Sequence, residues 1–239
     1  MKPVIPKQHG AWAMLIIPFL LNVLLGNPKI GHIPLFLAWL FLYLSTYPFL
    51  MSLKKTKKQK EFIKSFVFFF LSALLFLLYP LLDEPRLIYF GLAMIPFFYI
   101  NMYFSKQKQD RALLNDIIAV FIFGIGGLAS YFYGTGIIDE KAVLIFLLIF
   151  LYFLGTIFYV KTMIREKKNV KYKYVSWAYH IGLQAVFIII GQFGFALSYL
   201  FSTIRAIILY GKKVSIKTIG ITEILSSVFF TIIIILVLI

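Results

Sequence analysis

The chain has 239 residues, 62% of them hydrophobic, and its mean hydropathy is +0.92. Soluble domains have an apolar share of about 45–50%, so this composition excludes a soluble fold and favours a membrane protein. The formal net charge of +15 is divided among short segments between apolar runs, which argues against a nucleic-acid partner, and the lack of cysteine excludes disulfides and thiolate metal sites.

Nine apolar segments are predicted to be transmembrane helices, because a chain in lipid must satisfy its own backbone hydrogen bonds. They cover residues 9–26, 34–53, 62–82, 87–104, 113–133, 142–160, the two halves of 174–210, and 219–239. The stretch 174–210 exceeds the upper limit of about 25 residues for one span, and Gly191-Gln192-Phe193-Gly194 marks its turn. We expect the first segment to be a retained span, and one all-α transmembrane domain over residues 1–239.

The basic residues predict the orientation of these segments. Of the 24 Lys and Arg residues, 21 fall at the N-terminus or in every second gap, and only Lys29, Arg86 and Lys141 fall on the other side. Since Lys and Arg are retained on the cytoplasmic side, we expect a cytoplasmic N-terminus and an outer C-terminus in a cell membrane. The basic gaps also predict contact with anionic lipid headgroups.

A few polar side chains interrupt the predicted spans, and burying a charge there costs at least ~2.5–3.5 kcal/mol unless it is sheltered. His180, Arg205 and Glu223 lie six or seven residues inside a flanking Lys, so they reach a depth of roughly 9–11 Å. With His9 and Asp116, they predict a polar cavity open to the cytoplasm. Structural readings stay open beside this one: Arg205 snorkels to the interface, or a His–Glu or Arg–Glu pair forms between neighbouring helices.

The predicted site combines two groups of residues. His9, His180 and Glu223 are the candidate catalytic residues. The candidate ligand-binding residues are Asn101, Asp116, Lys161, Arg165 and Arg205. Cationic side chains bind phosphate directly, so Lys161, Arg165 and Arg205 favour an anionic lipid. Because no Asp-x-x-x-Asp spacing occurs, no metal site is predicted, and no cofactor is assigned.

Small residues cluster in two predicted spans. Gly124, Gly126 and Gly127 lie in the fifth, and Gly182 lies in the seventh. Such residues let helix backbones approach closely, so we expect tight helix packing at these positions.

The opening Lys7-Gln8-His9-Gly10-Ala11-Trp12-Ala13-Met14 and the later Tyr159-Val160-Lys161-Thr162-Met163-Ile164-Arg165-Glu166 resemble the signatures of the YwiC-like family of bacterial membrane proteins. This resemblance runs over the whole chain. It implies a multi-pass membrane protein and carries no activity with it.

The chain also resembles, more distantly, the UbiA-type prenyltransferases. The resemblance implies a UbiA-like bundle of nine helices with a cytoplasmic cavity that binds an isoprenoid or quinone-like lipid. The segment from Tyr103 to Asp116 is similar in layout to their fourth-to-fifth region, and residues 159–173 occupy the place of their second Asp-rich motif. Both Asp-rich motifs are absent, so the resemblance implies the scaffold and leaves metal-dependent prenyl transfer without its carboxylates. If the chain is an enzyme, it is a divergent UbiA-like transferase.

Three functions therefore follow from the sequence. The first is a membrane protein that binds an isoprenoid or other anionic lipid. The second is a small proton-linked transporter that uses Asp116, His180 and Glu223, although transporters typically show paired halves. The third is an accessory membrane subunit without a ligand.

Overall fold

The computed structural model describes residues 3–5, 9–54 and 57–239. Nine α-helices and no strand occur within these ranges, which confirms the all-α prediction. The chain divides into two compact units, residues 1–146 and 147–239, which are called unit 1 and unit 2 below. The prediction of a single transmembrane domain stays a prediction.

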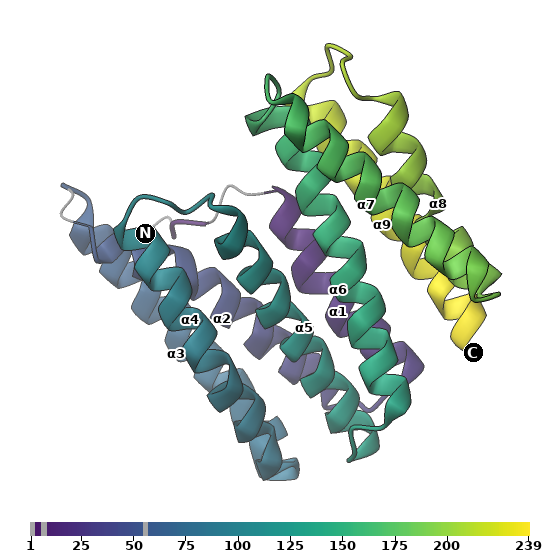
Figure 1. Cartoon of the computed structure of the whole chain (residues 1–239). Coiled ribbons are helices and arrows are strands. Elements are labelled where there is room, and N and C mark those ends of the chain that lie inside the picture. Colours follow the sequence, from purple (N-terminus) through teal and green to yellow (C-terminus); the bar gives the residue numbers. More distant parts are fainter. Residues whose placement is uncertain (1–2, 6–8, 55–56) are drawn as a thin grey trace. The chain divides into compact units, whose positions relative to one another are not determined.

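Unit 1 contains five helices and the start of a sixth (Figure 1). They are α1 (His9–Leu25), α2 (His32–Ser52), α3 (Gln59–Asp83), α4 (Ile88–Lys106) and α5 (Leu113–Thr135), with a short 3₁₀ turn at Pro85–Leu87 before α4. Helix α2 packs on α3, and α5 packs on both α1 and α4. Phe19, Leu35, Leu87 and Tyr133 form a buried cluster in this unit.

Unit 2 contains most of α6 (Glu140–Val160), α7 (Val170–Ile189), α8 (Phe193–Ile208) and α9 (Ile216–Leu238). Helix α8 packs on both α7 and α9. The connections from α6 to α7 and from α8 to α9 lie at the same end of the unit (Figure 1), since successive helices run in alternating directions. Every helix of unit 2 therefore brings one terminus to that end, which is called the basic end below because of its lysines.

Six helical segments are long and apolar enough to cross a membrane. They are His32–Ser52, Gln59–Asp83, Pro85–Lys106, Leu113–Thr135, Glu140–Arg165 and Ile216–Leu238. Ala11–Leu25 and Phe193–Ile208 are apolar but shorter, and the first turns of α7 carry Lys171 and Lys173. The structure thus supports a multi-pass membrane protein, whereas the count of nine spans stays a prediction.

The glycines of α5 confirm the prediction of close helix packing. A Cβ at Gly124 would lie 2.5 Å from the Phe146 ring, and one at Gly126 would lie 2.6 Å from Trp39. At Gly127 it would lie 2.8 Å from the backbone oxygen of Pro18 on α1. The same expectation is wrong for Gly182, where nothing lies within 4 Å of an added Cβ.

Helix α6 begins at a capped terminus. The Asp139 carboxylate accepts hydrogen bonds from the Ala142 backbone N–H at 2.9 Å and from the Tyr131 hydroxyl at 3.0 Å. The Ala142 bond is the main cause of the lowered pKa of Asp139, and the Tyr131 bond adds to it. The ionised carboxylate is therefore the form that caps the helix.

We expect Asp139→Ala to lower the free energy of unfolding by about 1 kcal/mol at neutral pH, because the cap is lost. Since the folded-state pKa lies below the unfolded value, the charge-dependent part of this contribution is present above the unfolded pKa and disappears as the pH falls through the folded pKa. Thermal unfolding in detergent across this acidic range measures the effect. Asp139→Asn is the matched control, since its amide oxygen still caps without titrating. A wild-type advantage over Ala that grew on acidification would contradict the assignment.

Candidate functional site

The centre of unit 2 holds a buried ion pair between two helices. The guanidinium of Arg205 on α8 donates through Nη1 to the carboxylate of Glu223 on α9, and the two side chains are only 3% and 8% exposed. Arg205 Nη2 also donates to the Thr156 hydroxyl of α6 at 3.1 Å. The Tyr159 ring covers the guanidinium, with Cζ 4.5 Å from its centroid. This arrangement confirms the Arg–Glu pairing that the sequence left open, and snorkelling of Arg205 is wrong.

Two buried nitrogen atoms in this region have no hydrogen-bond partner among the described residues: Nε of Arg205 and Nε2 of His180. His180 on α7 is 3% exposed, and its Nδ1 lies 2.7 Å from the Ser176 carbonyl oxygen. A carbonyl only accepts, so Nδ1 carries the proton, and Nε2 of a neutral ring is an acceptor. Buried polar groups normally have partners, so these two atoms mark places where a ligand or water fits.

Glycine 155 on α6 makes room for the His180 ring. A Cβ at this position would lie 3.1 Å from His180 Nε2 and 3.1 Å from the Tyr179 ring. Tyr179 donates to the Leu151 carbonyl oxygen at 2.8 Å and so holds α7 against α6. The imidazole thereby reaches the helix that also carries Thr156 and Tyr159.

Hydroxyl groups continue the polar region along α6 and α9. The Tyr152 hydroxyl donates to Ser226 at 2.9 Å and lies 3.2 Å from Ser227, whose own hydroxyl donates to the Glu223 backbone oxygen at 2.8 Å. Tyr152 is 1% exposed and stacks on Phe230 with centroids 4.2 Å apart. This row fixes the register of α9 against α6 and so places Glu223 opposite Arg205.

Sequence reasoning missed Thr156, Tyr152 and Tyr159. The signal was present in their spacing, because residues four and seven apart share one face of a helix. It was hidden because the chain contains 15 tyrosines, and spacing alone does not show which of them line a polar region.

The basic end lies beyond this buried region. Helix α6 passes into a π-helical turn over Lys161–Arg165, a geometry that often occurs at functional sites. Lys161 is 5% exposed, whereas Arg165 is exposed. Lys173 lies over the rings of Trp177 and Tyr210, with Nζ 4.5 and 5.0 Å from the centroids. Lys167, Lys168, Lys171, Lys212, Lys213 and Lys217 complete this basic end.

The remaining predicted site residues lie in unit 1. Asp116 is partly buried in the first turn of α5. Asn101 on α4 has a buried side-chain oxygen without a hydrogen-bond partner in the described part of the chain. His9 begins α1, but its side chain lies outside the described residues. The structure therefore brings His180, Arg205 and Glu223 together in one unit, and a single cavity shared with His9, Asn101 and Asp116 stays a prediction.

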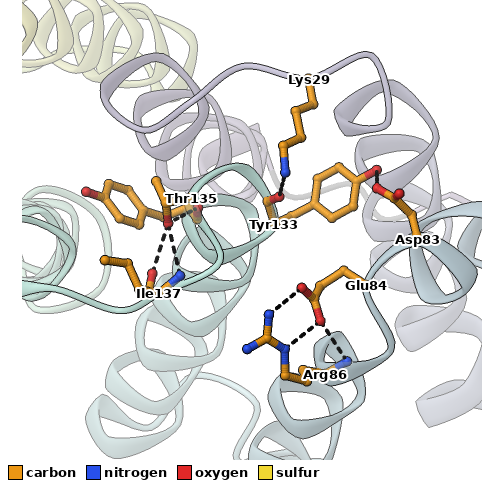
Figure 2. Close-up of polar contacts among 8 residues, drawn as sticks. Lys29, Asp83, Glu84, Arg86, Tyr133, Thr135 and Ile137 are labelled. Carbon is orange, nitrogen blue, oxygen red and sulfur yellow. Dashed lines mark hydrogen bonds and ion pairs between the residues drawn. The ribbon is translucent and has the colours of Figure 1, made fainter.

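A second polar cluster, in unit 1, escaped the sequence prediction. Lys29 donates to the Tyr133 backbone oxygen at 3.0 Å, and the Tyr133 hydroxyl donates to Asp83 at 2.7 Å (Figure 2). Beside them the Arg86 side chain donates to both oxygens of Glu84 at 2.7 Å, and this side-chain bond is the main cause of the lowered pKa of Glu84. These contacts join the α1–α2 connection, the α3–α4 connection and the end of α5. We read the cluster as a structural clasp.

A cavity of about 320 Å³ adjoins this cluster. Apolar residues of α1 and α2, including Phe19 and Phe36, line most of it, and Lys29 and His32 also border it, although its lining surface is almost wholly apolar. His32 has a partner at each ring nitrogen, since Nδ1 lies 2.9 Å from the Lys29 backbone nitrogen and Nε2 lies 2.9 Å from the Ser130 backbone oxygen. None of the sequence-predicted site residues lines this cavity.

The described residues contain no group of three or more His, Cys, Asp or Glu side chains that could hold a metal ion. The polar groups gathered in unit 2 are an Arg–Glu pair, an imidazole and hydroxyl groups. Such a set can bind an anion and can exchange protons.

Comparisons with known proteins agree on one family. A family model described as "YwiC-like protein" matches residues 5–131. A Bacillus subtilis (strain 168) protein with the name YwiC is 46% identical over 230 residues, which cover 96% of each chain. A protein of Haemophilus influenzae (strain Rd) is 38% identical over 231 residues, 96% of this chain and 97% of its own length. No solved structure matches the chain.

Proposed function

The chain belongs to the YwiC-like family of helical membrane proteins, and we propose that unit 2 binds the anionic headgroup of a membrane lipid at Arg205. The lipid is an isoprenoid phosphate or another phosphate-bearing lipid. One observation carries the proposal: Arg205 is buried beneath a basic end and keeps a guanidinium nitrogen, Nε, without a partner among the described residues. A planar guanidinium with spare donors is the side chain best suited to phosphate.

The basic end supports this proposal by its charge. Residues 161–173, from the π-helical turn through the connection to the first turn of α7, hold six basic residues and only one acid, Glu166. Clusters of Lys and Arg beside a membrane helix attract anionic lipid, each contributing about 1 kcal/mol near the surface. Lys161 and Arg165 are proposed to guide the headgroup toward Arg205, and Lys173, which lies over Trp177 and Tyr210, holds the ends of α7 and α8 together.

The membrane placement of this site is part of the proposal. We place the basic end at the cytoplasmic side of the bacterial cell membrane, with nine spans in a UbiA-like bundle, a cytoplasmic N-terminus and an outer C-terminus. The excess of Lys and Arg at this end supports the orientation.

Binding is proposed ahead of metal-dependent prenyl transfer. The Asp-rich motifs that such a reaction needs are absent from the sequence. His180 and Glu223 remain the acid–base candidates should the bound lipid react, since both are buried near Arg205.

Lipid binding is tested by native mass spectrometry of the detergent-solubilised full chain. Farnesyl monophosphate and phosphatidylglycerol are added in separate arms, which distinguish an isoprenoid phosphate from a phospholipid. We expect binding in at least one arm, and a loss of at least about tenfold in affinity in the double variant Arg205→Gln/Glu223→Gln, which removes the phosphate-binding cation while keeping the charge balance.

Lys58→Gln/Lys60→Gln is the matched control, because it removes two exposed basic charges from unit 1. It is expected to bind as the wild type does. If the wild type retains neither lipid, or if the control loses as much affinity as the Arg205 variant, the proposed function is wrong.

A further inference from the structure

The Arg205–Glu223 pair poses a problem of charge for any anion that binds there. The two side chains carry one positive and one negative charge in the interior of unit 2, where each is less than one-tenth exposed. An anionic headgroup on Arg205 would leave two negative charges around one positive charge. Uncompensated charge at such a depth costs several kcal/mol, so the anion cannot simply be added.

Few groups in unit 2 can compensate this charge. The titratable and charged side chains that interact electrostatically with the pair are Tyr152 and Tyr159 of α6 and His180 of α7. On α9 the nearest other charged residue is Lys217, six positions before Glu223. The tyrosines have only protons to lose, which would worsen the imbalance. His180 could gain a proton only at Nε2, since Nδ1 already donates to the Ser176 carbonyl oxygen, and burial of the ring and the positive charge of Arg205 both oppose a second cation there.

We infer that the Glu223 carboxylate occupies the anion-binding position of Arg205 when no ligand is bound. When an anionic headgroup binds to Arg205, Glu223 takes up one proton from the aqueous phase. The inference rests on the proposed function and specifies how the site works. The Nη1 bond to Glu223 is exchanged for bonds to a phosphate oxygen, and the carboxyl group becomes neutral. Net charge at the site is the same before and after, since one anion and one proton enter together.

The geometry supplies what this exchange needs. Thr156 can hold Nη2 of Arg205 while Nη1 and Nε turn to the ligand. A protonated Glu223 becomes a hydrogen-bond donor, and Nε2 of neutral His180 is a buried acceptor that lacks a partner in the described residues. Nε of Arg205 thus supplies a donor for the bound headgroup, and Nε2 of His180 and the Tyr159 hydroxyl oxygen, which is also unpartnered among the described residues, are the candidate acceptors for the Glu223 proton.

The test measures the number of protons that the protein takes up for each lipid bound. Phosphatidylglycerol is the probe, because its phosphodiester keeps one negative charge through the neutral pH range. Isothermal titration of the detergent-solubilised full chain in two buffers of different ionisation enthalpy gives the protons taken up per lipid. We expect about one, and an affinity that falls about tenfold for each unit of rising pH while Glu223 is ionised in the unbound protein.

Two variants test which carboxyl group takes up the proton. Glu223→Gln is expected to bind phosphatidylglycerol with no proton uptake and without pH dependence, since the amide is neutral in both states. Glu61→Gln is the matched control, because it removes an exposed carboxyl group of unit 1 by the same substitution, and it is expected to keep the proton count. The wild-type count needs no variant, so the inference stays testable if Glu223→Gln fails to fold.

The outcomes separate the two proposals. Binding of phosphatidylglycerol without proton uptake overturns this inference and leaves the proposed function standing. A proton count that persists in Glu223→Gln also overturns it. If the wild type binds no phosphatidylglycerol at any pH while it does bind farnesyl monophosphate, the exchange is wrong for phosphodiesters, and absence of both overturns the proposed function together with the inference.

Discussion

Replacing Arg205 by Met is expected to lower the free energy of unfolding by about 3–5 kcal/mol at neutral pH. The reason is the carboxylate left behind, because Glu223 is 6% exposed and loses its only close cation in unit 2. The lost bond to Thr156 and the lost packing on Tyr159 add smaller terms. The measurement is the apparent melting temperature of the detergent-solubilised protein, followed by size-exclusion chromatography after heating.

The double variant Arg205→Met/Glu223→Met is the control for this result. Replacing a whole buried ion pair by apolar residues of similar volume is often neutral or stabilising, so we expect the melting temperature to return to near the wild-type value. Lipid binding should nevertheless be lost, since the cation is gone. If the double variant is as unstable as the single one, the cost arises from packing around Arg205 and the charge argument is wrong.

Gly134→Ala is expected to destabilise unit 1 by about 1–3 kcal/mol. Gly134 lies near the end of α5, and a Cβ there would lie 2.4 Å from the backbone oxygen of Asn27 and 3.1 Å from its backbone nitrogen. Asn27 belongs to the connection between α1 and α2. Lys29 of the same connection donates a hydrogen bond to the Tyr133 backbone oxygen (Figure 2). A clash with tethered backbone cannot be relieved by a rotamer change, so the helix or the connection must shift.

Gly91→Ala is the matched control on α4, where nothing lies within 4 Å of an added Cβ. Alanine favours a helix over glycine by up to about 1 kcal/mol, so this variant should melt at or slightly above the wild-type temperature. An equal loss of stability in the two variants would show that the close approach of Asn27 to α5 is absent.

Most helix bounds were predictable because residues close to each helix end determine where the helix begins and ends. Residues 113–133 and 142–160 correspond to α5 (Leu113–Thr135) and α6 (Glu140–Val160). The turn at residues 191–194 was also predicted, and Gly191 adopts a positive φ of 74° between α7 and α8. The largest differences are at α7, which begins four residues before the predicted span, and at α3 and α9, which begin three residues before theirs. Backbone hydrogen bonds continue through charged turns, whereas hydropathy marks only the apolar part of a helix.

The site was only half predictable. His180, Arg205 and Glu223 stood out because charged and imidazole groups are rare in apolar segments, and the structure places them in the same unit. Tyr152 and Thr156 did not stand out, because neutral hydroxyl residues are common in membrane helices and only packing selects among them. The clasp of Lys29, Tyr133 and Asp83 joins residues about fifty or more positions apart, so no local pattern announces it.

By itself, the sequence determined that this chain is an all-helical membrane protein, where its helices lie, and which few side chains are too polar for an apolar interior. These properties depend on hydropathy and backbone hydrogen bonding, which are local. Only the tertiary structure decided that Arg205 is paired with Glu223 rather than turned to the interface, and that Thr156 and Tyr159 surround it. Pairing depends on which helix faces meet, and that is settled by the packing of residues far apart in the chain.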